Sequence, residues 1–253
     1  MSALISFKQV SVNLGGLSVL RDVSLDVDSG ETVVLLGRSG SGKTTALKLV
    51  NRLLLPSAGH VVVEGTSTTA WDPIRLRRRA GYVMQEGGLF PHLTVAQNIG
   101  LVPRLLGWAP GDIRKRVDEL LVQVELPPDK FLERYPRHLS GGQRQRVGIA
   151  RALAADPPML LFDEPFGALD PVTRFELQRQ FLRLRREYGK TSLFVTHDVR
   201  EALRLGTRIV LLANGGIDCV ASPAEFLRAS SPEVRTFLAG LDLIEKEGDR
   251  DVL

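Results

Sequence analysis

The chain has 253 residues, 43% of them hydrophobic and 25% charged, which is a globular composition with enough apolar material for a sizeable core. The formal net charge is +4, and the basic residues are scattered rather than gathered as in a nucleic-acid binder. A single cysteine, Cys219, excludes an internal disulfide and a cysteine cluster for zinc. No apolar run approaches the roughly 18 residues of a membrane span, and Met1–Val10 lacks the apolar stretch of a signal peptide. We therefore expect a cytosolic location and no nucleic-acid partner.

The N-terminal third is predicted to be rich in strands. Short strand-like segments separated by glycine-containing turns cover Ile5–Leu14, Val19–Val27 and Val61–Glu64. Between them, Glu31–Leu36 is apolar and β-branched, which predicts a buried strand. The apolar positions of Lys43–Leu54 recur with helical spacing, so a helix is expected there. The basic run Arg75–Arg79 is interrupted by an apolar residue and predicts a solvated helix face, with an electrostatic docking surface as the alternative.

The middle of the chain is predicted to be helical. Helix-like patterns cover Val95–Leu106, Asp112–Leu126 and Gln143–Ala154, with prolines as punctuation. Strand–helix alternation then returns, with buried strands predicted at Met159–Phe162 and Ser192–Thr196 and helices starting near Pro171 and Asp198. Continuous apolar strands that alternate with helices predict a parallel sheet covered on both faces. The middle region is therefore interpreted as a helical subdomain inserted into an α/β core.

One glycine-rich segment lies between the first buried strand and the helix that follows it. It reads Gly37, Arg38, Ser39, Gly40, Ser41, Gly42, Lys43, Thr44. In this pattern backbone N–H groups turn inward around phosphate oxygens, the lysine reaches the β- and γ-phosphates, and the Thr44 hydroxyl ligates Mg²⁺. The helix start adds a partial positive charge. The segment therefore predicts a nucleotide site, whereas the alternative is a chance glycine-rich turn before a helix.

Two further segments suggest ligand chemistry. The apolar strand Met159–Phe162 ends in Asp163 and Glu164, and ligands of such sheets bind at the carboxyl ends of the strands. Asp163 is placed to hold Mg²⁺ and Glu164 to polarise an attacking water, although a solvated acidic turn would have the same sequence.

The segment Leu139–Gln143 reads LSGGQ and opens a long predicted helix. Ser140 is a good N-cap, but two glycines in the first turn cost stability without local benefit. We interpret them as allowing a bare helix start to approach an anion, which suggests a nucleotide held in trans by a second subunit.

These motifs, in this order, resemble those of ABC transporter ATPases over roughly Leu4 to Leu241. The resemblance implies a P-loop NTPase α/β fold with a parallel sheet, an N-terminal antiparallel β subdomain and an inserted helical subdomain. The expected domain is 1–241, with the core at about 1–86 and 155–241 and the helical subdomain at about 87–154. Residues 242–253 are expected to form a charged tail.

The resemblance also implies ATP and Mg²⁺ as cofactors. The family's catalytic residues match Glu164, His197 and Gln85, and its Mg²⁺ ligands match Thr44, Gln85 and Asp163. The ATP contacts implied here are residues 37–45, including Thr45, in one subunit and Ser140, Gly141, Gly142 and Gln143 in the other. Asp170 resembles the residue that couples the two sites, and Gln85 the lever that joins the core to the helical subdomain. Taken alone, His197 would be interpreted as a capping or core histidine.

The resemblance narrows to importers of quaternary ammonium osmoprotectants such as glycine betaine, choline and carnitine. It rests on Gly88–His92, Leu101–Trp108 and Ala152–Asp170. It implies a head-to-tail homodimer that binds integral membrane permease subunits at the cytoplasmic face of the cell membrane, and indirectly an extracytoplasmic solute-binding protein. Leu101, Leu105, Leu106 and Trp108 are expected either to meet the permease or to pack as helical core.

Two positions depart from the family pattern. An aromatic ring normally stacks on the adenine where this chain has Leu14; alternatively Leu14 faces the core and Phe7 covers the base. Many relatives carry a C-terminal regulatory domain, whereas 21 residues follow Pro232 (233 to 253), so we expect no regulation by such a domain.

Three other functions are alternatives to an osmoprotectant importer. An importer of another solute, such as an amino acid, would carry the same motifs. A soluble ABC ATPase that acts on nucleic acid or ribosomes would carry two sets of these motifs in one chain, or long arms that split its core. A phosphotransferase could use the phosphate loop, but the segment LSGGQ would have no function in it.

Overall fold

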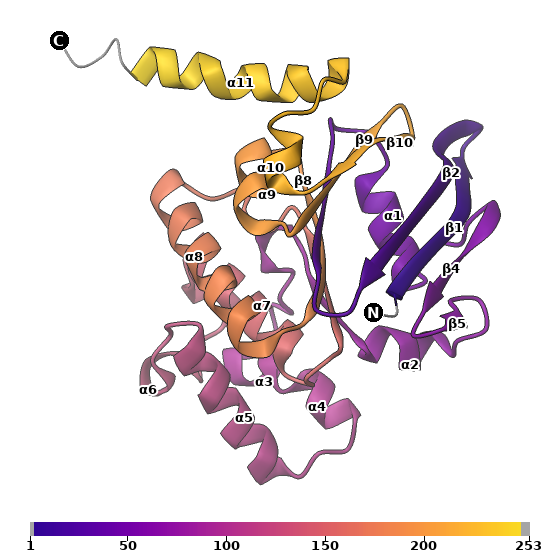
Figure 1. Cartoon of the computed structure of the whole chain (residues 1–253). Helices are drawn as coiled ribbons and strands as arrows, with labels where there is room; N and C mark the ends of the chain where they lie inside the picture. Colours follow the sequence, from indigo (N-terminus) through magenta and orange to yellow (C-terminus); the bar gives the residue numbers. More distant parts are fainter. Residues whose placement is uncertain (1–2, 249–253) are drawn as a thin grey trace. The chain divides into compact units, whose positions relative to one another are not determined.

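The computed structural model describes residues 3–248, and it describes the side chains of those residues except for residue 86 and residues 242–248. The chain divides into two compact units (Figure 1). Unit 1 comprises Met1–Ala70 and Leu193–Leu253, and unit 2 comprises Trp71–Ser192. Unit 2 contains the expected helical subdomain together with neighbouring strands and helices, and each unit is described in turn.

Unit 1 begins with an antiparallel sheet in the strand order β2-β1-β4-β5. Its strands are β1 (Ala3–Leu14), β2 (Leu17–Asp28), β4 (Ala58–Val63) and β5 (Thr66–Ser67). Gly15 and Gly16 form the turn between β1 and β2, with φ values of +56° and +82°. Ile5, Phe7 and Val10 of β1 are at most 2% exposed. The predicted N-terminal antiparallel β subdomain is therefore confirmed.

The second sheet of unit 1 carries the phosphate loop. Its strands follow the order β10-β9-β3-β8, with β3 at Thr32–Leu36, β8 at Thr191–Thr196, β9 at Arg208–Ala213 and β10 at Gly216–Ala221. Strands β3 and β9 are parallel, with Leu36 opposite Leu211, and β10 is an antiparallel edge strand. The helices of this unit are α1 (Lys43–Val50), α9 (Val199–Leu205), α10 (Pro223–Phe226) and α11 (Pro232–Gly248). The last helix runs into the range expected to be a charged tail.

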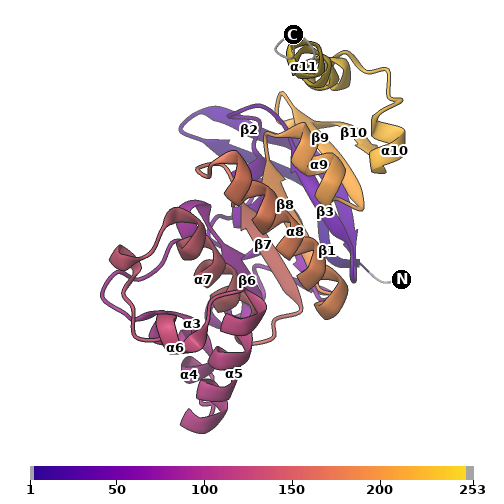
Figure 2. The ribbon, with the colours of Figure 1, turned by 90° about the vertical axis from the view of Figure 1, so that its left-hand side faces the viewer.

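In unit 2, the parallel strands β6 (Ala80–Val83) and β7 (Met159–Asp163) pair with Val83 opposite Phe162. The helices are α2 (Pro73–Arg78), η1 (Gln85–Gly87), α3 (Val95–Ile99), α4 (Leu101–Leu105), α5 (Pro110–Gln123), α6 (Pro128–Phe131), η2 (Pro136–His138), α7 (Gly141–Leu153) and α8 (Pro171–Tyr188). Figure 2 shows α3, α4, α5 and α6 grouped below β6 and β7. The basic run lies on α2, where Leu76 is buried and Arg75, Arg77 and Arg79 are exposed, as predicted.

The segment Val95–Leu106, predicted to be helix-like, forms two short helices, α3 and α4, with Gly100 between them. A Cβ at Gly100 would lie 2.8 Å from Ile113 Cγ2, so α5 packs too closely for a larger residue. The helix predicted over Lys43–Leu54 also ends early, at Val50, and Arg52 has a left-handed backbone with φ +54°.

No helix in the described part of the chain is long and apolar enough to cross a membrane.

Helix α7 lies in close contact with the segment that follows Gln85. A Cβ on Gly148 of α7 would lie 3.1 Å from Gly87 Cα, and a Cβ on Gly87 would lie 2.7 Å from the Arg144 carbonyl oxygen. Arg151 of α7 donates hydrogen bonds to the carbonyl oxygens of Gly87 and Gly88 at 3.0 and 2.9 Å. The backbone of this segment is therefore held against α7 at van der Waals distance.

Replacing Gly87 by alanine is expected to lower the free energy of unfolding by about 1–3 kcal/mol. The reason is twofold: its φ of +77° strains any residue with a Cβ, and the added atom meets the backbone of α7. Urea denaturation of Gly87→Ala and wild type measures the difference. Gly111→Ala is the control, because a Cβ there meets nothing within 4 Å and the residue lies in helix α5. Equal unfolding midpoints for Gly87→Ala and wild type would contradict the packing described.

Candidate functional site

The phosphate loop of unit 1 joins β3 to α1. Gly42 precedes the helix and has a left-handed backbone with φ +98°. A Cβ there would lie 2.4 Å from Leu20 Cδ2 and 2.9 Å from the Val19 carbonyl oxygen, so only glycine fits. Gly40 is also left-handed, with φ +81°. The loop therefore needs glycine at two of the positions where the motif supplies it.

Lys43 points into this loop. Its side chain is buried, with the residue 4% exposed, and its Nζ donates hydrogen bonds to the carbonyl oxygens of Gly37 and Arg38 at 2.8 and 2.9 Å. Thr44 and Thr45 follow in the first turn of α1 and are half-buried. A lysine ammonium at a helix start, enclosed by backbone, favours a bound anion such as a phosphate.

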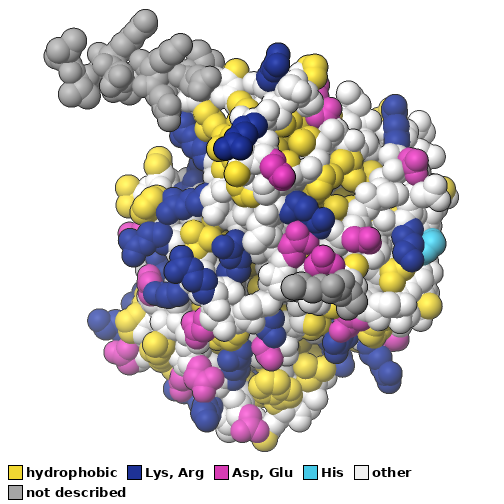
Figure 3. Space-filling model, viewed as in Figure 1, with side chains coloured by type: hydrophobic (Ala, Val, Ile, Leu, Met, Phe, Trp, Pro, Cys, Tyr) yellow, Lys and Arg dark blue, Asp and Glu magenta, His cyan; other side chains and the backbone are white. Residues whose placement is uncertain are grey.

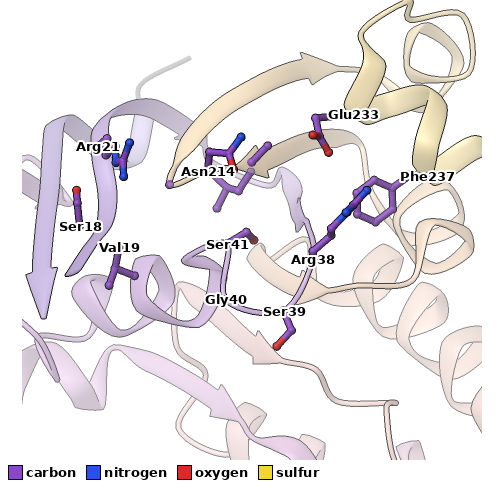
Figure 4. A pocket seen from close by; sticks show the side chains of 13 residues that line it. Ser18, Val19, Arg21, Arg38, Ser39, Gly40, Ser41, Asn214, Glu233 and Phe237 are labelled. Atoms are coloured by element: carbon purple, nitrogen blue, oxygen red, sulfur yellow. The ribbon is translucent and has the colours of Figure 1, made fainter. Parts of the chain in front are cut away.

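A cavity of about 480 Å³ lies beside the loop within unit 1 (Figure 4). Arg38, Ser39, Gly40 and Ser41 form one part of its lining. The Ser41 hydroxyl is buried and has no hydrogen-bond partner among the described residues. This hydroxyl can therefore donate to a polar ligand in the cavity.

Leu14 lies at the end of β1 and is 42% exposed. The alternative that Leu14 faces the core is therefore wrong. Phe7, the ring considered in its place for the base, is 2% exposed and packs in the core. Among the described residues that line the cavity, Leu14 is absent, and its contact with a nucleotide stays a prediction.

The carboxylates of unit 2 lie at the carboxyl end of β7, as predicted. Asp163 is the last residue of the strand, and Tyr82 of β6 donates its hydroxyl to Asp163 Oδ2 at 3.1 Å. Burial, together with the neighbouring Asp163 carboxylate, raises the pKa of Tyr82 well above its usual value, so the hydroxyl keeps its proton and remains a donor. Glu164 follows with a left-handed backbone, φ +46°.

Gln85 and Glu164 meet beside Gly167. A Cβ placed on Gly167 would lie 3.7 Å from Gln85 Nε2 and 3.9 Å from Glu164 Oε2. The two side chains come from η1 and from the residue after β7, which are 79 residues apart in sequence (164 minus 85). Unit 2 therefore brings together the predicted water-activating carboxylate and the predicted lever residue.

His197 of unit 1 follows β8 directly and is exposed. Asp198, not His197, caps helix α9, because its side chain accepts from the Arg200 backbone N–H at 2.8 Å. The turn that carries His197 is stabilised by the buried Thr196 hydroxyl, which donates to Glu201 Oε2 at 2.6 Å. The interpretation of His197 as a cap or core residue is therefore wrong, and its side chain is accessible.

Helix α7 starts at Ser140, which is exposed and forms a capping box with Gln143. Its hydroxyl oxygen accepts from the Gln143 N–H at 3.3 Å. A Cβ on Gly141 would make ordinary contacts, the nearest at 3.6 Å, whereas one on Gly142 would lie 2.4 Å from Thr173 Cγ2 of α8. The interpretation that neither glycine has a local benefit is wrong for Gly142, which allows α8 to approach.

Asp170 is the N-cap of α8, and its Oδ1 accepts from the Thr173 backbone N–H at 3.0 Å. This hydrogen bond lowers the pKa of Asp170, so the side chain stays ionised near neutral pH. Its predicted role in coupling two sites remains a prediction.

Sequence reasoning missed the residues that support the site. No prediction covered Tyr82, and Thr196 and Glu201 were predicted only as strand and helix positions. Their partners lie on neighbouring elements or across a turn, so no local motif marks them. The signal available was a polar residue inside an apolar pattern, as at Glu201, which is 4% exposed.

A glycine-rich loop after a buried strand and carboxylates after another define an α/β protein of the phosphate-loop type. The comparison with protein families is more specific: residues 20–167, more than half of the chain, match the model described as ABC transporter. The chain belongs to the ABC transporter family.

Two curated relatives are named as ATP-binding proteins of transport or import. The chain is 48% identical over 248 residues to the glycine betaine/carnitine/choline transport ATP-binding protein OpuCA of Bacillus subtilis, covering 97% of this chain and 65% of that protein. It is 49% identical over 226 residues to the osmoprotectant import ATP-binding protein OsmV of Salmonella typhimurium, covering 89% of this chain and 59% of that protein. The chain thus spans less than two thirds of the length of either relative.

Among solved structures, the fold is similar to the ATP-binding cassette MJ0796, described as a dimer in a post-hydrolysis state bound to ADP and Pi. The TM-score is 0.77 at 36% sequence identity, covering 87% of this chain and 98% of that chain. The expected α/β class, with its parallel and antiparallel parts, is confirmed.

If Asp163 holds Mg²⁺ as the sequence predicts, replacing Tyr82 by phenylalanine is expected to weaken Mg²⁺ binding about tenfold, because the Asp163 carboxylate loses the donor that orients it. The free energy of unfolding should also fall by about 1 kcal/mol. The measurement is the Mg²⁺ concentration for half-maximal nucleotide binding. Tyr135→Phe, which removes a hydroxyl elsewhere in unit 2, should leave this concentration unchanged. An unaltered Mg²⁺ requirement in Tyr82→Phe would show that the hydrogen bond does not orient Asp163.

Proposed function

We propose that this chain is the ATP-binding and ATP-hydrolysing subunit of an ABC importer for a quaternary ammonium osmoprotectant such as glycine betaine or choline. The observation that carries the ATPase assignment is the convergence of Gln85 and Glu164 beside Gly167, next to Asp163. The solute class is supported by the names of relatives that are 48% and 49% identical to this chain.

In this proposal the phosphate loop binds the triphosphate. Lys43 exchanges its loop carbonyl partners for β- and γ-phosphate oxygens, and backbone N–H groups at the start of α1 donate to the others. The donors offered to Mg²⁺ are the Thr44 hydroxyl, the Gln85 amide oxygen and the Asp163 carboxylate, all hard oxygen ligands that suit this ion. Bound Mg²⁺ would neutralise charge on the phosphates.

Glu164 would act as the group that polarises the attacking water. Its carboxylate lies one residue beyond the Mg²⁺ ligand Asp163 and shares the surroundings of Gly167 with Gln85. His197 is exposed on a turn that the Thr196–Glu201 hydrogen bond stabilises, and it would contact the γ-phosphate. Both roles follow the resemblance to ABC ATPases.

A second copy would complete the site, arranged head to tail. Ser140 is exposed at the helix start and Gly141 is half-buried with only ordinary contacts around it, which suits a phosphate approached from outside the subunit. Asp170 lies at the adjoining start of α8 and would couple the two sites. The dimeric form of the similar cassette MJ0796 supports this arrangement.

A groove of about 310 Å³ in unit 2 offers a docking place for the permease. It is lined mainly by apolar side chains, including Met84, Phe90, Leu101 and Val102, with Arg151 at its side. Leu105 and Leu106 on the neighbouring α4 segment are 54% and 43% exposed rather than core residues. Figure 3 shows hydrophobic side chains gathered over α4. The subunit would thus bind a permease at the cytoplasmic face of the membrane, with an extracytoplasmic binding protein on the other side.

Uptake by vesicles that contain the permease, the binding protein and this chain tests the solute class. Labelled glycine betaine or choline should accumulate only with ATP inside the vesicle. Accumulation of an amino acid, but of no quaternary ammonium solute, would contradict the solute class and keep the importer assignment.

Glu164→Gln is expected to abolish steady-state ATP hydrolysis while stabilising an ATP-bound dimer, because the water is not activated and both phosphate contacts remain. Size-exclusion chromatography with and without ATP, alongside phosphate release, measures both effects. Glu187→Gln, on the exposed end of α8, is the matched control. Normal hydrolysis by Glu164→Gln, or failure to dimerise with ATP, would overturn the role of Glu164.

Lys43→Ala should lose at least tenfold in ATP affinity, because a charge-assisted contact to the phosphates is removed.

Ser140→Arg should bind ATP normally as a monomer but fail to dimerise, because the larger side chain blocks the contact with the nucleotide of the second subunit. Lys48→Ala controls for loss of a lysine from α1, and Ser140→Ala for loss of the helix cap. Calorimetric titration and chromatography separate the two effects. Equal loss of monomer binding in Lys43→Ala and Ser140→Arg would contradict a trans site.

A further inference from the structure

The groove of unit 2 lies beside strand β6. Ala80 and Tyr82 of this strand line the groove, as does Met84 just after it, and Leu101 and Val102 line it from α4. In Figure 2 α4 lies below β6. Alternate residues of a strand point to the same face, so Ala80, Tyr82 and Met84 form one wall of the groove. The Tyr82 residue is half-buried there.

The same tyrosine also contacts a predicted Mg²⁺ ligand. Its hydroxyl donates to Asp163 Oδ2 at 3.1 Å, across the pair of strands β6 and β7. Tyr82 lies opposite Leu161, and Asp163 is two residues further along β7, so both side chains are on the same face of the pair. One side chain therefore belongs both to the groove and to the surroundings of the carboxylate.

The length of this hydrogen bond leaves room for adjustment. A hydrogen bond from a hydroxyl to a carboxylate is commonly about 2.5–2.7 Å long. The bond from Tyr82 to Asp163 is longer, at 3.1 Å. A molecule that packs against the Tyr82 ring from the groove can press the hydroxyl toward the carboxylate. The shorter bond would hold Asp163 more firmly in one orientation, and a carboxylate that is held by such a partner binds a metal more tightly.

Another part of the groove lining is held more firmly than Tyr82. Arg151 donates to the carbonyl oxygens of Gly87 and Gly88 at 3.0 and 2.9 Å, and its guanidinium lies 5.8 Å from the centroid of the Phe90 ring. The Tyr82 side chain makes one hydrogen bond to the described part of the chain, and that bond is long. An occupant of the groove would therefore move the Tyr82 ring more readily than the wall at Arg151.

We propose that Tyr82 couples the groove to the Mg²⁺ site, so that a permease segment docked in the groove tightens Mg²⁺ binding through the Tyr82 hydroxyl. This inference rests on the proposed function, both for the permease in the groove and for Asp163 as a Mg²⁺ ligand. Tyr82 is a positioning residue, since it acts through Asp163. The docked subunit would thus bind nucleotide with Mg²⁺ at a lower Mg²⁺ concentration than the free subunit.

A benzyl group attached inside the groove can take the place of the docked segment in a test. Val102→Cys provides the thiol in a Cys219→Ser background, because Cys219 is the one cysteine of the chain. Benzyl methanethiosulfonate attaches the group through a disulfide and dithiothreitol removes it, so each sample is its own control. Val122→Cys is the matched control, because Val122 is 64% exposed on α5 and does not line the groove.

The measurement is the Mg²⁺ concentration for half-maximal nucleotide binding. Benzylation of Val102→Cys should lower this concentration several-fold, up to about tenfold, and dithiothreitol should restore it. The same benzylation combined with Tyr82→Phe should have no effect, because no hydroxyl is left to press on Asp163. Benzylation of Val122→Cys should change the Mg²⁺ requirement in neither background.

Fluorine NMR of protein labelled with 3-fluorotyrosine shows whether the benzyl group reaches the ring. The chain has three tyrosines, Tyr82, Tyr135 and Tyr188, and the Tyr82 signal is the one that disappears in Tyr82→Phe. Benzylation of Val102→Cys should shift this signal and leave the other two in place.

The possible failures are distinguishable. A Tyr82 signal that does not shift, an unchanged or raised Mg²⁺ requirement, or an equal effect of benzylation in Tyr82→Phe would overturn the coupling role of Tyr82. Absence of Mg²⁺-dependent nucleotide binding by unmodified wild type would instead overturn the proposed ATP site.

Discussion

The close contact between α7 and the segment after Gln85 is the constraint on which the rest of unit 2 depends. Glycines at 87 and 148 let two backbones touch, and Arg151 ties the segment down through two carbonyl oxygens. The same helix begins after its N-cap Ser140, so α7 connects an exposed helix start with the segment that follows Gln85. Close packing of this kind transmits a displacement between the two ends of the helix better than a loose contact would.

Neighbouring polar residues support the side chains that are predicted to be functional. Tyr82 orients Asp163, and the Thr196–Glu201 pair fixes the turn below His197. In each case a half-buried or exposed side chain has a hydrogen bond that fixes it or the turn on which it lies. Such support holds a predicted functional group in place while it remains accessible.

Local sequence motifs made much of the fold and of the candidate site predictable. The phosphate loop, the carboxylates after β7 and the capped helix at Ser140 depend on residues adjacent in sequence, and the structure has them where expected. The close approach of Ile113 to Gly100 was not predictable, because Ile113 belongs to another helix. That Phe237 lines the cavity beside the phosphate loop was not predictable for a similar reason: only folding brings α11, near the end of the chain, to the loop that follows β3.

The left-handed backbone of Glu164 has an evolutionary consequence. A residue with a Cβ costs about 1–2 kcal/mol in this conformation, and glycine would relieve that strain. Selection for stability alone would favour glycine here, and the predicted role of the carboxylate in polarising water would oppose that change. Thermostable variants obtained by random mutagenesis and screening for folding would be enriched in inactive substitutions at this position. A screen that also demands turnover is needed to keep Glu164.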